Sequence, residues 1–351
     1  MDKVCQILNA VKGLSGKELE RISDVLIKML GQTNGVHGSF VKEAEKCRAC
    51  GAEQIVKFGK DKNGKQRYKC KSCGATFTST SFSTISRTRH SEYVWETYIE
   101  SLLKGASLNE CASQCGISTR TAFIWRHKIL STLQSDQDNR IMAGIIEADE
   151  LFIPVSYKGN HKKSTRFTMP RKSFKRGSDN RSNLSPKACV MCAVERNGQS
   201  YGEVLGVGQP TAKMIAHAFQ ERIAPDSIML SDRALGMKSY FATKPDVDLI
   251  RLKSNVAGRK GRHDRGKPEI RGIYHIQTVN NFHKRLHDFL RGYLGVATKY
   301  LNHYINLFVW LENHKAQEVA PADSMKSHIG NNAPYVPAHT LFSLAPLPIA
   351  S

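Results

Sequence analysis

The sequence contains no long hydrophobic stretch. The longest unbroken apolar run covers seven residues, 188–194, whereas a helix that spans a membrane needs about 20. The first residues, Met-Asp-Lys-Val-Cys-Gln, do not show the charged and then apolar pattern of a signal peptide. We therefore expect neither an integral membrane protein nor a secreted one.

Acidic residues are also in short supply. The 351 residues include 52 Lys and Arg but only 31 Asp and Glu, which gives a formal charge of +21. With 40% hydrophobic residues the chain is long and apolar enough for two or three folded domains. A surplus of positive charge this large favours a polyanionic partner, most simply nucleic acid. The alternative is that the charge only keeps the protein soluble.

The nine cysteines are an odd number, which argues against a framework of disulfides. Four of them form two pairs of equal spacing, Cys47-x2-Cys50 and Cys70-x2-Cys73. Two such turns complete a tetrahedral Zn²⁺ site, so we predict a structural zinc in a zinc ribbon over residues 41–80. The alternative is four reduced thiols in a small core. The pairs Cys111/Cys115 and Cys189/Cys192 are expected to pack in the core instead.

Residues 88–140 are predicted to form short helices. We expect one at 93–104, a second that begins at the capping box Ser107-Leu-Asn-Glu110 and ends at Gly116, and a third at 119–132. The glycine between the last two is typical of a helix-turn-helix, although an ordinary helical hairpin has the same periodicity. The polar side chains of the third helix that would then face DNA are Thr119, Arg120, Thr121, Arg126, His127 and Lys128.

The two ends of the chain differ in pattern from the middle. Residues 1–40 hold a capping box at Ser15 and Glu18, an amphipathic helical pattern and a Gly-rich linker. Residues 316–351 hold five of the twelve prolines and show no periodicity. We predict that this C-terminal tail is extended or partly disordered.

Residues 141–315 alternate between strand and helix patterns. Strands are expected at 145–155, 188–195, 201–207, 227–230 and 247–252, and helices at 211–223, around 240, and from 278 to 315 with a break near 292–295. Three antiparallel strands, a helix, a parallel strand, a helix, a strand and a terminal helix is the order of a ribonuclease H-like domain. The predicted fold class is therefore multidomain: a small zinc ribbon and an α-helical helix-turn-helix, followed by an α/β ribonuclease H-like catalytic domain.

Two aspartates occupy unusual places in this domain. Asp149 lies inside an otherwise apolar strand, where a charge is costly unless something pairs with it. Asp232 closes the apolar strand Ile-Met-Leu-Ser, and ligands gather at such strand ends. Two carboxylates on adjacent strands repel each other unless cations such as a pair of Mg²⁺ ions neutralise them. The alternative is that both acids are surface partners of the many Lys and Arg.

The motifs of this region resemble those of bacterial insertion-sequence transposases of the DDE class, in the branch with an N-terminal zinc ribbon and helix-turn-helix. The resemblance covers roughly residues 44–312. It rests on the segments Glu-Ala-Asp149-Glu, Tyr157-Lys-Gly-Asn160, Ser231-Asp232, Gln277-Thr-Val-Asn280 and Gly295-Val-Ala-Thr-Lys-Tyr-Leu301. It implies DNA cleavage and strand transfer with Mg²⁺ or Mn²⁺, and it assigns Asp149 and Asp232 as the first two metal ligands.

The third ligand position departs from the acid that many relatives have. Asn280 stands there, and its amide oxygen can bind Mg²⁺ but carries no charge. We therefore predict weaker metal affinity, or help from Glu147 or Glu150. The alternative for Asn280 is a helix cap, and His283 is the fallback ligand.

Two basic stretches, residues 158–181 and 251–271, are expected to line the path of the DNA. Phosphate contacts from Lys and Arg supply affinity that does not depend on sequence, although a solvated loop would have the same composition. Tyr157, Lys158 and Asn160 follow the first catalytic strand and are candidates for contact near the metals. The further candidates are Arg171, Lys172, Arg259, Lys260 and Arg262.

The predicted function is thus an insertion-sequence transposase that binds terminal inverted repeats of double-stranded DNA and cleaves and joins DNA with divalent metal. Because two ends must be joined in one event, we expect at least a dimer, and a bacterial cytoplasmic location with the protein on the nucleoid when bound. Three alternatives stay open: a zinc-ribbon transcription regulator, a degenerate transposase that binds without cutting, and a nuclease that cleaves without joining.

Overall fold

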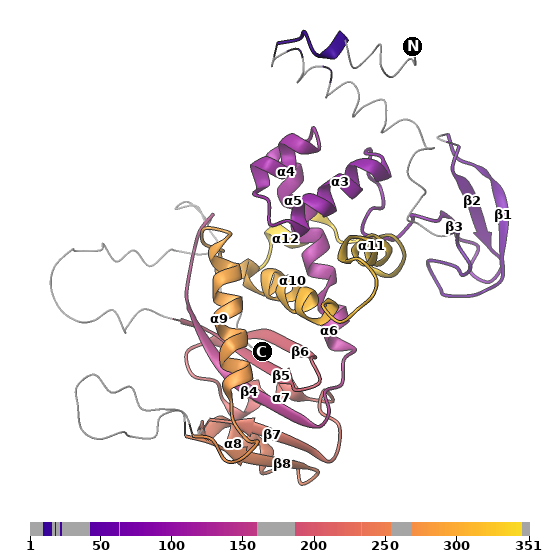
Figure 1. The fold of residues 1–351 in the computed structure, drawn as a ribbon. Coiled ribbons are helices and arrows are strands. Elements are labelled where there is room, and N and C mark those ends of the chain that lie inside the picture. The colour runs from indigo at the N-terminus through magenta and orange to yellow at the C-terminus, as the bar shows by residue number, and fades with distance from the viewer. Residues whose placement is uncertain are drawn as a thin grey trace. The chain divides into compact units, whose positions relative to one another are not determined.

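The computed structural model describes residues 10–15, 18, 22, 43–62, 64–159, 187–232, 234–253 and 269–345 (Figure 1). The chain divides into two compact units. Unit 1 comprises Met1–Ile129 and Val319–Pro337, and unit 2 comprises Leu130–Glu318 and Ala338–Ser351. Within the described ranges, no helix is both long and apolar enough to cross a membrane.

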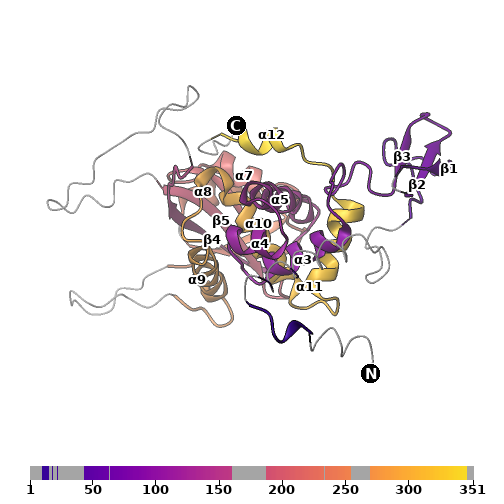
Figure 2. The same ribbon diagram turned by 90° about the horizontal axis from the view of Figure 1, so that it is seen from above.

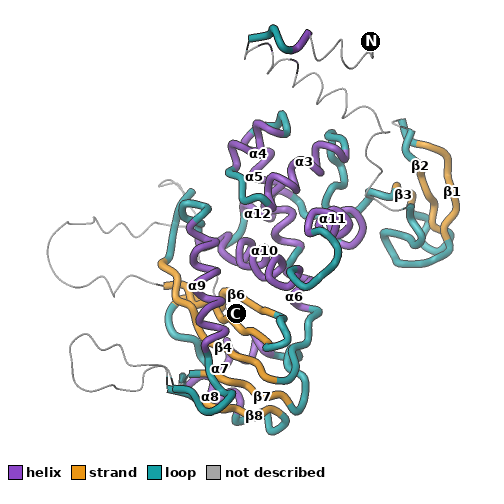
Figure 3. Tube along the Cα trace, viewed as in Figure 1, coloured by secondary structure: helices purple, strands orange, loops and turns teal. Residues whose placement is uncertain are grey.

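Unit 1 contains a small antiparallel sheet of three strands (Figure 3). The strands are β1 (Ile55–Lys60), β2 (Gln66–Cys70) and β3 (Thr76–Thr78), in the order β1-β2-β3. Tyr68 and Phe77 stack across β2 and β3 with ring centroids 5.8 Å apart, and with Cys47 and Cys70 they form the buried core of this sheet. All three strands lie within residues 41–80, where the sequence predicts a zinc ribbon.

Three helices follow the small sheet: α3 (Glu92–Leu103), α4 (Leu108–Gln114) and α5 (Thr119–Thr132). The capping box predicted at Ser107 and Glu110 is confirmed, since each side chain accepts a backbone N–H of the other residue. Gly116, with a φ of +60° that favours glycine, makes the turn between α4 and α5. Trp95 of α3 stacks on Trp125 of α5 with centroids 3.7 Å apart, which joins these two helices in one core.

The predicted extended tail is wrong for residues 321–342. The structure has α11 (Pro321–Ser327), a π-helical turn η3 (His328–Asn332) and α12 (Ala338–Phe342). Proline is favoured in the first helical turn because its missing N–H would have no partner there, so Pro321 begins α11 rather than breaking it. Met325 and Ile329 are fully buried, and Lys326 lies 2.6 Å from Glu96 of α3. A few buried apolar residues and this ion pair therefore hold α11 and η3 in unit 1.

At the N-terminal end, the predicted capping contact is present. The Ser15 hydroxyl donates to Glu18 at 2.6 Å, and the Ser15 N–H donates to the same carboxylate at 2.9 Å. Most of the amphipathic helix predicted after it lies outside the described residues.

Unit 2 is built on a five-stranded mixed sheet with the order β6-β5-β4-β7-β8. Its strands are β4 (Ile145–Pro154), β5 (Lys187–Glu195), β6 (Ser200–Val207), β7 (Ser227–Ser231) and β8 (Val247–Arg251). β5 pairs antiparallel with both β4 and β6, whereas β7 pairs in parallel with both β4 and β8. β4 therefore lies at the centre of the sheet, where the antiparallel and parallel halves meet.

Helices cover both faces of this sheet (Figure 2). One face carries α7 (Ala212–Phe219) and α8 (Leu235–Phe241), and the other carries α9 (Gln277–Arg291) and α10 (Leu301–His314). Two shorter elements are α6 (Gln134–Asp138) and the 3-10 turn η2 (Thr298–Tyr300). A Cβ at Gly202 of β6 would lie 2.9 Å from the Ile305 side chain of α10, so the glycine allows that helix to pack closely. The predicted order of strands and helices is confirmed.

Candidate active site and metal centres

The acidic cluster of unit 2 is assembled by the pairing of β4 with β7. In this parallel pair Ala148 lies opposite Ser231, so the next residues, Asp149 and Asp232, stand level on adjacent chains. Carboxylate oxygens of Asp149, Glu150 and Asp232 all lie within 4.8 Å of one another. Asp232 is held by the Ala234 N–H, which donates to its Oδ1 at 2.8 Å. The two aspartates that the sequence singled out are therefore neighbours.

Burial and mutual repulsion act on these carboxyls in the same direction. Burial, with the charge of Asp232, raises the pKa of Asp149 to about 7. Burial, with the charges of Asp232 and Asp149, also raises the pKa of Glu150 to about 7. Because burial and repulsion disfavour the ionised carboxylates, a bound cation would stabilise them strongly.

Helix α9 brings His283 to the edge of this cluster. The His283 Nδ1 lies 3.8 Å from the Asp149 Oδ2, and burial lowers the pKa of the imidazole to about 4, so the ring is neutral at pH 7. Asn280 lies three residues earlier on the same helix and is exposed. Its N–H donates to the Ile276 carbonyl at 3.2 Å, as the first turn of a helix requires. Asn280 as a metal ligand stays a prediction.

Glu147 does not join the acidic cluster. It is fully buried, and its carboxylate accepts hydrogen bonds from the first turn of α9 and from Arg196. Of the two acids that the sequence offered as additional help, Glu150 lies with the aspartates and Glu147 is engaged elsewhere. Sequence reasoning did not identify Arg196, His275 and Thr278 as its partners, because nothing local marks them.

The donor set of the acidic cluster fits a divalent cation. Glu150 Oε1 and His283 Nε2 are buried and have no hydrogen-bond partner among the described residues, and buried polar atoms normally have one. Mg²⁺ prefers carboxylate oxygens and Mn²⁺ also accepts imidazole nitrogen. The unsatisfied atoms and the convergent carboxylates thus mark a place suited to such an ion.

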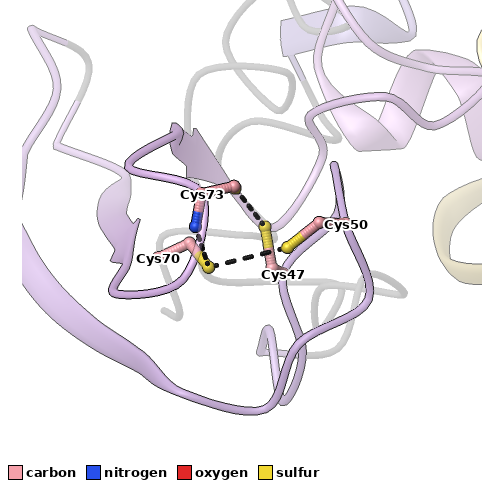
Figure 4. A group of neighbouring side chains, drawn as sticks. All are labelled: Cys47, Cys50, Cys70 and Cys73. Atoms are coloured by element: carbon pink, nitrogen blue, oxygen red, sulfur yellow. Dashed lines mark hydrogen bonds between the residues drawn. The ribbon is translucent and has the colours of Figure 1, made fainter.

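The four cysteines of unit 1 form a second cluster (Figure 4). Their sulfur atoms lie within 4.8 Å of one another, and the Sγ–Sγ distances are 3.7 Å for both Cys47–Cys73 and Cys50–Cys70. The Cys73 N–H donates to the Cys70 Sγ and contributes to a pKa of about 6 for that thiol. Thiolates at these distances can hold a tetrahedral Zn²⁺.

Only part of α5 is open to a partner. Arg120 is exposed and Thr121 half-buried at its first turn. Arg126 was predicted to contact DNA, but it is 2% exposed and its Nη2 donates to the Ala106 carbonyl at 2.6 Å. The prediction is wrong for Arg126 because this residue lies on the buried face of α5. Lys128 is half-buried, with its Nζ 4.7 Å from the centre of the Tyr335 ring.

Most of the other candidates for DNA contact lie outside the described residues. Lys158 is exposed, and its Nζ donates to the carbonyls of Leu294 and Gly295 at 3.3 Å each. Tyr157 is half-buried beside it in the chain. The remaining candidates lie outside the described residues: Asn160, Arg171, Lys172, Arg259, Lys260 and Arg262.

Comparisons with known proteins give one match to a family and several to solved structures. Residues 141–313 match the family model of the ISXO2-like transposase domain. A pre-cleavage Mos1 transpososome is 11% identical over 62% of this chain and 78% of that chain, with a TM-score of 0.19. The Mos1 strand transfer complex is 12% identical with the same coverage and TM-score. The Mos1 mariner paired end complex with Mn is 12% identical over 63% and 79%, with a TM-score of 0.19. Likeness at this TM-score establishes neither fold nor function. None of the curated proteins compared matches the chain.

Proposed function

We propose that residues 141–313, which match the family model of the ISXO2-like transposase domain, act as a DDE-class transposase, and that the chain binds the ends of a mobile DNA element and cleaves and joins DNA there. The single observation that supports the chemical part is the set of carboxylates from Asp149, Glu150 and Asp232 within 4.8 Å of one another. These carboxylates stand inside the matched domain. A DNA-binding regulator would have no use for three mutually repelling acids in a half-buried site.

Asp149, Asp232 and Glu150 would hold the divalent ion, with His283 and Asn280 of α9 as further donors. When bound, Mg²⁺ or Mn²⁺ lowers the pKa of water or of a hydroxyl and stabilises the charge that develops on phosphate oxygens. Asp149 and Asp232 are fixed on the central strands of the sheet, so they orient the attacking oxygen against the scissile phosphate.

Unit 1 would recognise the DNA. The zinc ribbon would be closed by Cys47, Cys50, Cys70 and Cys73, and α4 and α5 would act as a helix-turn-helix. In that motif the first residues of the second helix contact base edges. This is the part of α5 where Arg120 is exposed. The sequence-independent part of the affinity would come from the basic loops and Lys158, and two bound ends require at least two protomers.

The test uses purified full-length protein with Mn²⁺ or Mg²⁺ and duplex DNA that carries the element's own ends. Joined products, absent with the Asp232→Asn variant, support the proposal. Cleavage without joining would instead identify a nuclease. Retarded but intact DNA would identify a regulator or a transposase that no longer cuts.

A further inference from the structure

The buried carboxylate of Glu147 contacts the beginning of α9 at three points. Its Oε2 accepts the N–H groups of Thr278 at 2.7 Å and Val279 at 3.1 Å. Its Oε1 accepts the Thr278 hydroxyl at 2.8 Å. Arg196 donates to the same Oε1 through Nε and Nη2, both at 3.2 Å, and the His275 Nδ1 lies 3.3 Å away. A carboxylate with 0% exposure is thus fully engaged.

These contacts replace the cap that α9 lacks in its own sequence. The first N–H groups of a helix have no partner within the helix, and their partial positive charge favours an anion. The N-cap position is occupied by Ile276, which offers no side-chain acceptor. The cap of α9 therefore comes from β4, the strand that carries Asp149.

The geometry links this cap to the acidic cluster. Glu147 and Asp149 are two residues apart on β4 and point to the same face, about 6.6 Å apart along the strand. Thr278 and His283 are five residues apart on α9, about 7.5 Å along the helix. β4 and α9 are thus joined by the hydrogen bonds between Glu147 and Thr278. They approach each other again two residues further along β4 and five residues further along α9, where His283 Nδ1 lies 3.8 Å from Asp149 Oδ2.

We propose that Glu147 is a positioning residue: it fixes the start of α9 to the catalytic strand, and so sets where α9 holds His283 against Asp149. It acts through these residues and does not bind the metal itself. The inference rests on the proposed function, because it supposes that the acidic cluster binds a divalent ion. Partners that orient metal ligands in this way typically change metal affinity by about 10- to 100-fold when removed.

The test measures Mn²⁺ binding to the full-length protein without DNA, from the electron paramagnetic resonance signal of the free ion. Glu147→Gln keeps the shape of the side chain but removes the charge that Arg196 and the helix start require. We expect roughly tenfold weaker Mn²⁺ binding and faster hydrogen exchange at the amides of Thr278 and Val279. Wild-type affinity within twofold, with unchanged exchange at these amides, would overturn the proposal.

Glu195→Gln is the matched control. Glu195 is also a buried carboxylate of the same sheet, and its Oε1 accepts a backbone N–H, that of Ala143, at 3.1 Å. Among the described residues, no hydrogen bond or ion pair joins its side chain to α9, so its loss should leave Mn²⁺ binding unchanged. An equal loss of binding in both variants would show general destabilisation and refute a specific role of Glu147.

Two further variants separate the remaining outcomes. If Glu147→Gln does not fold, Thr278→Val and Thr278→Ser replace it: the valine, which lacks the hydroxyl, should weaken Mn²⁺ binding, and the serine should not. Equal binding by the two would contradict the proposal. Asp149→Asn should abolish binding at the site altogether. If the wild type binds no more Mn²⁺ than Asp149→Asn, the metal site itself is refuted, which is a different result from a Glu147→Gln variant that binds normally.

Discussion

The cysteine cluster of unit 1 and the acidic cluster of unit 2 both bring donor atoms within 4.8 Å of one another, but the chain assembles them differently. The four cysteines come from two short turns in one small sheet. Two of them, Cys47 and Cys70, make up half of the buried core of that sheet. The acids come from β4 and from the end of β7, in the middle of a large sheet with its own apolar cores. We expect the small sheet of unit 1 to need its cluster in order to fold, whereas the large sheet of unit 2 folds in spite of its cluster.

This difference separates a structural site from a reactive one. Four soft sulfur donors leave no open position on a tetrahedral zinc. The carboxylates of unit 2 have a pKa raised by burial, and the sheet that carries them does not depend on them for its stability. Such carboxylates can leave coordination positions open for substrate, and a bound ion would stabilise their charged form. The predictions below test whether the two clusters are independent in this way.

The largest effect is expected from Cys47→Ser. Because the ribbon has few apolar contacts of its own, zinc binding of about 10–16 kcal/mol should supply most of its folding energy. We expect the bound zinc, measured by mass spectrometry of the metal, to fall from one per chain to nearly none, and binding to element ends to be lost. The melting temperature followed by the fluorescence of Trp95, Trp125 and Trp310, which all lie outside the ribbon, should change little.

Cys189→Ala is the control for this variant. Cys189 is a fully buried thiol of β5 in unit 2, so its removal should lower the melting temperature and leave the zinc content at one. A Cys47→Ser protein that kept its zinc and its end binding would show that the cysteines are ordinary core residues.

The next largest effect concerns chemistry alone. Asp232→Asn keeps the volume of the side chain and removes one of the charges that would hold the ion. We expect strand transfer, followed by gel electrophoresis of labelled ends, to fall by about 10³-fold, equal to roughly 4 kcal/mol. Zinc content and DNA affinity should stay as in the wild type.

Asp248→Asn provides the comparison on the neighbouring strand. Asp248 lies exposed on β8 and outside the acidic cluster, so the variant should retain full activity. Similar losses in both variants would mean that acidity in general, and not the level pair of aspartates, supports the reaction.

The two clusters also differ in how far the sequence could predict them. Cys47, Cys50, Cys70 and Cys73 were found from spacing alone, because a Cys-x2-Cys turn is local. Asp149 and Asp232 were found because a charge in an apolar strand and an acid at a strand end are each unusual. Their proximity followed from the predicted order of strands. The pairing of Ala148 with Ser231 places the two aspartates level with each other.

What the sequence could not predict depends on contacts between distant elements. Glu147 looked like a third acid of the site, but the docking of α9 makes it a helix cap. Arg126 matched the polar pattern of a recognition helix, but the packing of α5 against the loop at Ala106 buries it. The tail helices depend on a few apolar residues, such as Met325, that carry no periodic signal.

A smaller effect is expected from pH, and it should act on the two clusters differently. The folded-state pKa of both Asp149 and Glu150 is about 7, above the usual value. Between about pH 4 and 7 the folded protein holds protons that the unfolded chain has released, so unit 2 should lose stability as pH rises through this range. Mn²⁺ must displace these protons, and its affinity should fall about tenfold per pH unit below 7 for each proton released.

Melting temperatures at pH 5 and pH 8, with and without Mn²⁺, check this prediction. The ion should raise the melting temperature of unit 2 much more at pH 8 than at pH 5, and Asp149→Asn should remove most of that difference. Zinc should remain bound at pH 6.5, because a thiol that coordinates the metal is deprotonated by it. An Mn²⁺ effect that is the same at both pH values would contradict the raised pKa of these carboxyls.

The smallest effect should come from single arginines of α5, where exposure and burial give opposite results. Arg120→Ala removes an exposed cation at the start of the helix, and we expect about 1 kcal/mol weaker binding of element ends, or roughly fivefold, with no change in melting temperature. Arg126→Met removes the charged donor to the Ala106 carbonyl, and the loss of a hydrogen bond from a charged group costs about 1.5–3 kcal/mol of stability. That variant should melt at a lower temperature but bind DNA normally once folded. If Arg126→Met weakened DNA binding and Arg120→Ala did not, the first turn of α5 would not be the part of unit 1 that meets DNA.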